Sequence, residues 1–382
     1  MKEQINIGVN HEVLVWARNS LALTRNQASE KTQISFKRLS QLEDGVKSPT
    51  LDELKAFSKA YKRTIATLLL LKPPVEKPLP ADRRTVDSQS LSIFHEKSVM
   101  AVRKARALAQ SYIELRQEVG IEIPGLKFSA SLWDDPKFKA ETLRNELNLD
   151  EIREIKNINH ALEAYIEKVE SLGVAVFQLS LTQDQIRGFS IVDEIIPVIG
   201  IKRGSEAPTG KIFTLFHELG HILLNEGGLC DLSEKSNVEI EKWCNSFSAE
   251  MLIPTSELLQ MEIVADQKQR GEKTWAKGDL VALGNYFHVG PLAILRSLLQ
   301  NNLTSSAFYD QKHIIWNKPQ FGRSKNPEGR NIAKETIKEK GRTYLSMAFK
   351  AYDQNRIDLK DLSDFLGIKL SYITRTRQLM NA

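Results

Sequence analysis

The stretch Phe213-Thr-Leu-Phe-His-Glu-Leu-Gly-His-Ile-Leu-Leu224 places two histidines four residues apart within a run of apolar residues. Such a run without Pro predicts a buried helix. Positions i and i+4 lie on one face of a helix, so His217 and His221 can point ring nitrogens at one metal ion. Glu218 is aimed beside that ion rather than at it. The pattern therefore predicts a hydrolytic zinc site.

In such a site Zn²⁺ lowers the pKa of water to about 7 and polarises the scissile carbonyl. Glu218 would be the general base that accepts the proton and later delivers it to the leaving amine. The alternative is a structural helix whose two histidines only form hydrogen bonds. With seven histidines in the chain, a chance match to this pattern is expected in roughly one such sequence per hundred.

A catalytic zinc ion usually takes three protein ligands and keeps one position for water. On the helix predicted near 237–252, Glu241 shares its face with Cys244 and Ser248. These side chains are small, so this face can approach the first helix closely. Glu241 is therefore the predicted third metal ligand, and Glu239 is the alternative.

Two further sets of ligands stay open. Glu250 lies on a flank of the same helix with bulkier neighbours. Cys230 and Asp231 follow a Gly-Gly turn near the second histidine, although their spacing matches no common metal-binding pattern.

Composition indicates a globular protein of the reducing cytosol. The 382 residues are 41% hydrophobic and 26% charged, and only two are cysteines. Two cysteines form no disulfide framework. The first residues show no signal-peptide pattern, and the apolar run Leu68–Leu71 is far too short to cross a bilayer. We expect a cytoplasmic protein without a membrane partner.

The net charge of +5 is unevenly distributed, because both ends of the chain are basic and the middle is acidic. Basic ends can meet nucleic acid or an acidic protein. Solvated helix faces are the plainer explanation of the same distribution.

The predicted fold is α+β and mostly helical. We predict a small all-α domain at 1–71, a Pro-rich linker at 72–90, a zincin-like metallopeptidase domain with a short mixed sheet at 91–300, and a helical domain at 301–382. Three strands are expected near 174–179, 189–192 and 197–201. We expect the last strand to be the sheet edge beside the metal-binding helix, where a substrate peptide could add as an extra strand.

Residues 211–224, followed by Glu241-Lys-Trp-Cys-Asn-Ser-Phe-Ser-Ala-Glu-Met-Leu-Ile-Pro254, resemble the ImmA/IrrE family of zinc metallopeptidases. The resemblance covers residues of about 170–300. It implies His217, His221 and Glu241 as zinc ligands and Glu218 as general base. It leaves the oxyanion-stabilising group open, with Tyr286 and His288 as candidates.

The resemblance also implies a biological role, namely cleavage of a DNA-binding repressor that silences stress, DNA-damage or mobile-element genes. Two alternatives remain. The chain could be the toxin of a toxin–antitoxin or phage-defence pair, or a DNA-binding regulator with an idle zinc site. The expected partner is thus a protein substrate, either a helix-turn-helix repressor or an antitoxin.

Residues 13–70 are similar to the helix-turn-helix of the Xre/Cro repressor family, through Leu23–Ser35, Phe36–Gly45 and Pro49–Leu51. The resemblance implies that Thr24 caps the second helix and that Ser35 caps the recognition helix. The DNA-binding residues expected from it are Arg25, Ser35, Phe36, Lys37, Arg38 and Gln41. Gln33 departs from the family pattern, because a Gly is usual at this turn. The module could instead pair with another helix-turn-helix.

Residues 358–379 could form a second helix-turn-helix that touches DNA or a partner. The alternative is a helical bundle that completes the core.

Overall fold

The computed structural model describes residues 8–21, 23–76, 96–123, 125–181, 187–192, 194–204, 206–225, 234–316 and 331–381. The chain divides into two compact units, Met1–Val102 and Arg103–Ala382. Most of the predicted linker 72–90 lies outside the described residues. Within the described residues, no helix has both the length and the apolar character needed to cross a bilayer.

The first unit is a helical domain. Its helices are α1 (His11–Asn19), α2 (Arg25–Thr32), α3 (Phe36–Glu43), α4 (Leu51–Tyr61) and α5 (Ile65–Leu68). The Thr24 hydroxyl caps α2 by accepting from the N–H of Gln27, and Ser35 caps α3, as the sequence predicts. The turn between these helices is made by Gln33, which adopts a left-handed conformation with φ of 57°.

One buried carboxylate joins the first three helices of this unit. Glu43, on α3, is only 2% exposed. It accepts from Nε of Arg18, on α1, at 2.7 Å and from Nε of Arg25, on α2, at 2.9 Å. A buried charge is tolerated when it is paired and hydrogen-bonded in this way.

The second unit begins within α6 (Glu96–Glu118) and contains the sheet. Before the sheet come α7 (Pro136–Leu147), the 3₁₀ helix η1 (Leu149–Glu154) and α8 (Ile158–Glu170). The strands are β1 (Ala175–Leu179), β2 (Gly188–Ile191) and β3 (Val198–Lys202). After them come α9 (Pro208–Leu223), α10 (Glu234–Leu252), α11 (Thr255–Gln260), α12 (Glu262–Arg270), α13 (Lys277–Tyr286), α14 (Pro291–Gln300), α15 (Ser306–Trp316), α16 (Ile332–Lys340), α17 (Arg342–Asp353), α18 (Leu359–Leu366) and α19 (Leu370–Met380). The α+β, mostly helical fold class is confirmed.

The strand order corrects one expectation. The order is β1-β3-β2, with β1 parallel and β2 antiparallel to β3. The strand predicted as the edge, β3, is therefore the central one, and β1 and β2 are the edges. Gly200 lies in the middle of β3, and the ring of Phe189 on β2 covers the space that a Cβ at Gly200 would occupy. A side chain at this position would displace that ring.

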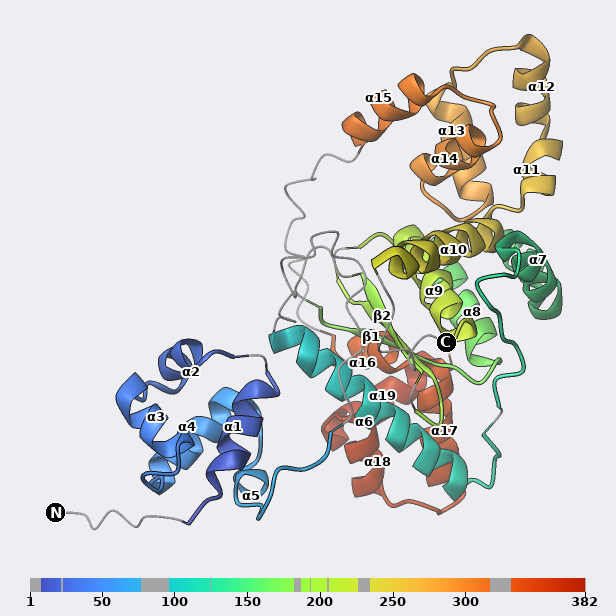
Figure 1. The fold of residues 1–382 in the computed structure, drawn as a ribbon. Coiled ribbons are helices and arrows are strands. Elements are labelled where there is room, and N and C mark those ends of the chain that lie inside the picture. Colours follow the sequence, from blue (N-terminus) through green and yellow to red (C-terminus); the bar gives the residue numbers. More distant parts are fainter. Residues whose placement is uncertain are drawn as a thin grey trace. The chain divides into compact units, whose positions relative to one another are not determined.

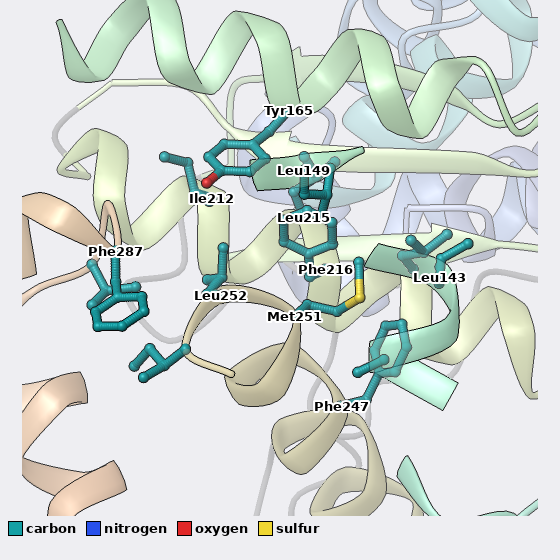
Figure 2. Packing of buried hydrophobic residues seen from close by; sticks show 14 of the residues in the cluster. Leu143, Leu149, Tyr165, Ile212, Leu215, Phe216, Phe247, Met251, Leu252 and Phe287 are labelled. Atoms are coloured by element: carbon teal, nitrogen blue, oxygen red, sulfur yellow. The ribbon is translucent and has the colours of Figure 1, made fainter. Parts of the chain in front are cut away.

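One face of the sheet packs on α8 and α9, and α10 packs on α9 (Figure 1). Val176, Ile199 and Ile201 on this face belong to the same buried cluster as Leu215 of α9. Figure 2 shows the next layer, in which Tyr165 of α8 meets Phe216 of α9 with a centroid distance of 5.6 Å and near-perpendicular rings. Burial of this apolar surface fixes α9 between the sheet and α10.

The opposite face of the sheet is covered by α16 and α17 (Figure 1). Phe177 of β1 meets Tyr344 of α17 at 6.2 Å between centroids, and Tyr344 also meets Tyr112 of α6. Gly341, whose φ of 79° ends α16, separates α16 from α17. The C-terminal helices thus complete this core.

A partly buried carboxyl group lies between α8 and α17. Glu170, at the end of α8, accepts hydrogen bonds from the Thr343 hydroxyl and from the N–H of Val176. Burial raises the pKa of Glu170 to about 8, because the two hydrogen bonds only partly offset the loss of solvation.

We expect Glu170→Gln to change how stability depends on pH. The folded chain holds this proton to higher pH than the unfolded chain, so wild-type stability should fall as pH rises from about 4.5 towards 8. The variant cannot ionise here and should lose less stability over this window, by up to a few kcal/mol, since one pKa unit is about 1.4 kcal/mol. Urea unfolding at several pH values measures this.

The matched control is Glu146→Gln, which removes an exposed carboxylate from α7. Its pH profile should parallel that of the wild type. Parallel profiles for all three proteins would contradict a buried, proton-holding Glu170.

Candidate metal centre

Three potential metal-ligand side chains meet between α9 and α10. Nε2 of His217 lies 3.2 Å from Nε2 of His221, which is one helical turn further along α9. The Glu241 carboxylate, on α10, lies 3.2 Å from the first ring nitrogen and 3.3 Å from the second. Both histidines are buried and Glu241 is partly buried. Among the described residues, these three are the only group of ligand type gathered in this way.

The donor set fits a tetrahedral zinc ion. Zinc binds imidazole nitrogen and carboxylate oxygen at about 2.0–2.2 Å, so neighbouring ligand atoms of a tetrahedron are roughly 3.3–3.5 Å apart. The three separations here are within about 0.3 Å of that range. Glu241 Oε1 is also buried, and Nε2 of His221 lies 3.3 Å from it. Two imidazoles and one carboxylate leave the fourth position open, as a catalytic site requires.

The electrostatics of the cluster favour an ionised Glu241. Burial alone would raise the pKa of this carboxyl group. Hydrogen bonds and electrostatic interaction with His217 and His221 outweigh burial and hold the pKa of Glu241 well below its usual range. The carboxylate is therefore available as an anionic ligand.

Glu218 lies beside this cluster and faces β2. It is 3% exposed. A Cβ added at Gly188 would lie 3.1 Å from Cγ of Glu218 and 2.6 Å from Cγ2 of Thr214. The first residue of β2 therefore has to be small for Glu218 and Thr214 to fit. The sequence gives only one indication of this role of Gly188, namely a glycine at the start of a predicted strand.

A second glycine sets the distance between the two helices. A Cβ added at Gly220 would lie 3.1 Å from Sγ of Cys244 and 3.3 Å from its Cβ. Cys244 and Ser248, on the same face of α10, are fully buried. The small residues expected to permit a close approach do lie at this contact. The approach brings the Glu241 carboxylate within reach of both histidines.

The other ligand candidates lie elsewhere or outside the described residues. Glu239 is exposed. The Glu250 carboxylate accepts from the N–H and the hydroxyl of Thr255 at 2.7 Å each. Cys230 and Asp231 lie outside the described residues.

Both candidates for oxyanion stabilisation have other partners. Nε2 of His288 lies 3.0 Å from the Ile155 carbonyl oxygen and Nδ1 lies 3.3 Å from the Tyr165 hydroxyl. The Tyr286 hydroxyl donates to Glu257 at 2.8 Å. These contacts support structural roles for both side chains.

The residues expected to bind DNA fall into two groups. Arg25 is paired with Glu43 and Asp44, and Arg38 donates to both Glu53 carboxylate oxygens at 2.7 and 2.8 Å. Ser35 is exposed and caps α3, Phe36 is 50% exposed, Lys37 is exposed and Gln41 is partly exposed. Phe36, Lys37 and Gln41 are therefore the side chains that this helix presents without a carboxylate partner among the described residues.

Comparison with known families now adds to this geometry. Residues 169–298 match the family model described as the IrrE N-terminal-like domain, a peptidase M78 model. Residues 14–68 match the model described as helix-turn-helix. The chain thus joins a helix-turn-helix module to a peptidase domain. The resemblance expected from the sequence is confirmed. No curated protein and no solved structure matches the chain.

We predict that Gly220→Val weakens both the fold and zinc binding. Its side chain must push α9 and α10 apart at Cys244, and overpacking of this kind costs about 1–3 kcal/mol. Because the ligands lie on both helices, zinc affinity should fall with stability. Gly278→Val is the matched control, since a Cβ at Gly278 meets no atom within 4 Å. Wild-type zinc affinity in Gly220→Val, measured by competition with a chelator, would show that the close approach is not needed.

Proposed function

We propose that residues 169–298 are a zinc-dependent endopeptidase, with His217, His221 and Glu241 as zinc ligands and Glu218 as general base. The observation that carries the proposal is the ligand cluster, in which the two histidine nitrogens lie 3.2 Å apart and each lies 3.2–3.3 Å from one oxygen of the Glu241 carboxylate. This cluster is set in a domain that matches a peptidase family model. When bound, zinc supplies a Lewis acid that polarises the scissile carbonyl and lowers the pKa of a water molecule.

The chain itself supplies proton transfer. Glu218 accepts a proton from the attacking water and delivers it to the amine that leaves when the peptide bond breaks. Because Glu218 is one residue after His217 on the helix, it lies beside the three zinc ligands and is not itself a ligand. Gly188 lies against its Cγ, so β2 limits the space open to this side chain.

We place the extended substrate peptide along the edge strand β2. This strand is a sheet edge, and its first residue packs against Glu218. An extended peptide that adds to β2 would pass close to the general base while its backbone forms sheet hydrogen bonds. This replaces the expectation that β3 is the receiving edge.

We propose a DNA-binding repressor as the substrate class and transcriptional derepression as the outcome of cleavage. The support is the combination in one chain of a peptidase domain and a helix-turn-helix module. The module could direct the peptidase to DNA where a repressor is bound. Pairing of the module with the helix-turn-helix of the repressor itself is the alternative.

The zinc-to-protein ratio of the purified chain tests the site. We expect a ratio near one for the wild type and for Glu218→Gln, and a large loss of zinc in His217→Ala and Glu241→Ala. Glu239→Ala is the matched control, because it removes an exposed glutamate from the same helix. A ratio near zero in the metal-replete wild type would contradict the proposal.

Peptidase activity is tested by labelling new protein N-termini in cells that express the wild type or Glu218→Gln. Loss of the general base should reduce cleavage at least about a hundredfold while zinc is retained. New termini in a helix-turn-helix protein, seen with the wild type alone, are the expected result. Identical termini in both strains would exclude the assigned role of Glu218.

A further inference from the structure

The last helices of the chain reproduce the local geometry of α2 and α3. Both α2 and α18 span eight residues. Each begins with a reciprocal capping box, formed by Thr24 with Gln27 in α2 and by Asp358 with Asp361 in α18. The two helices therefore start in the same way.

The turns that follow are also equivalent. Gln33 closes α2 with φ and ψ of 57° and 25°, and Gly367 closes α18 with 62° and 32°. In each case the serine four positions earlier donates from Oγ to the carbonyl one position after the turn residue, at 2.6 Å. The next helix begins three positions after the turn residue, at Phe36 in one motif and at Leu370 in the other.

The buried positions coincide as well. The corresponding pairs are Ala28 with Leu362, Thr32 with Leu366, Ile34 with Ile368, Leu39 with Ile373, and Leu42 with Thr376, all buried. The helix caps, the turn and the buried positions of α18 and α19 thus correspond to those of α2 and α3.

The helices that precede the two motifs, α1 and α17, end at corresponding positions. α1 ends at Asn19 and α17 at the equivalent position, Asp353. In both motifs an ion pair joins this helix to the last one. Arg18 pairs with Glu43 at 2.7 Å, and Asp353 pairs with Arg377 at 2.6 Å, with the charges reversed. The order and spacing of α17, α18 and α19 therefore correspond to those of α1, α2 and α3, while the packing differs, because α17 packs on α18 and α19 packs on α16.

The outward face of α19 has the chemistry of a base-reading surface. Ser371, Thr374, Arg375 and Gln378 follow one another at i, i+3, i+4 and i+7, so they form one stripe. All four are exposed. Each side chain can donate hydrogen bonds, as Arg does to guanine and Gln to adenine in a major groove.

This stripe is free of acidic charge. α19 contains no Asp or Glu; Arg375 lies in the stripe, Lys369 precedes the helix, and Arg377 lies outside the stripe and is paired with Asp353. Among the described residues, Arg375 donates to the amide oxygen of Gln378 at 3.4 Å, and no carboxylate lies at ion-pair distance from it. In α3, by contrast, Arg38 is held by Glu53. A basic, donor-rich helix face complements the phosphates and base edges of DNA.

We propose that residues 342–380 are a second DNA-binding helix-turn-helix, with α19 as its recognition helix. The chain then has one DNA-binding module before the peptidase domain and one after it. The acidic residues of α18 do not oppose this assignment. Asp358 and Asp361 are used in the capping box, and Asp364 occupies the position that Glu30 occupies in α2.

The test measures binding of the full chain, with Glu218→Gln to silence the peptidase, to a fluorescent mixed-sequence DNA duplex about three helical turns long. Arg375→Ala should weaken binding about fivefold or more, and should reduce the salt dependence of binding by about one charge if Arg375 meets a phosphate. Lys37→Ala, on α3, reports separately on the first module. Lys350→Ala is the matched control, because Lys350 is exposed on α17 outside the stripe.

Two results would overturn the proposal. The first is an unchanged DNA affinity in Arg375→Ala, whether or not Lys37→Ala removes binding. Absence of any binding of the full chain to the duplex would overturn the proposal in the same way. The second is a change of oligomeric state in Leu370→Glu with DNA affinity unchanged, which would make this face a protein interface. If Arg375→Ala lowers the unfolding temperature, Arg375→Gln keeps a hydrogen-bonding side chain and repeats the comparison.

Discussion

The close packing of α9 on α10 is the constraint on which the candidate site depends. The two histidines are fixed relative to each other by one helical turn, but Glu241 comes from a different helix. It reaches them because Gly220 and Cys244 leave almost no space between the two backbones. A glycine in a helix interior costs about 1 kcal/mol relative to alanine. Here that cost is offset by a close approach of α9 and α10 that a side chain at Gly220 would crowd.

The three-stranded sheet supports this pair of helices from one side. Its apolar face buries α9, and the opposite face is closed by α16 and α17. A sheet covered on both faces needs apolar residues along each strand, and β1 is buried at every position. The edge strand β2 contributes a glycine where the general-base candidate needs room. The same strand thus combines a structural role with a place at the site.

Two short helical modules, α1 to α3 and α17 to α19, share one local design. Side-chain caps, a left-handed turn residue and a serine hydrogen bond specify the turn in both, and these are interactions between close neighbours in sequence. The modules differ in their outward faces. α3 has its Arg38 engaged by Glu53, whereas the face of α19 bears an arginine with no carboxylate partner among the described residues. Two modules with the same local backbone geometry can therefore bind different ligands.

The sequence by itself determined the features that depend on local geometry. Helical spacing put His217 and His221 on one face, small residues singled out the face of Glu241, and Thr24 and Ser35 were recognisable as caps. Tertiary structure decided what depends on distant partners. It made β3 the central strand, placed Gly188 against Glu218, engaged Arg25 and Arg38 in ion pairs, and joined the C-terminal helices to the sheet. The reason is that a helix fixes i and i+4 neighbours through its own backbone hydrogen bonds, whereas strand order and ion pairing are set by which segments meet after the core has packed.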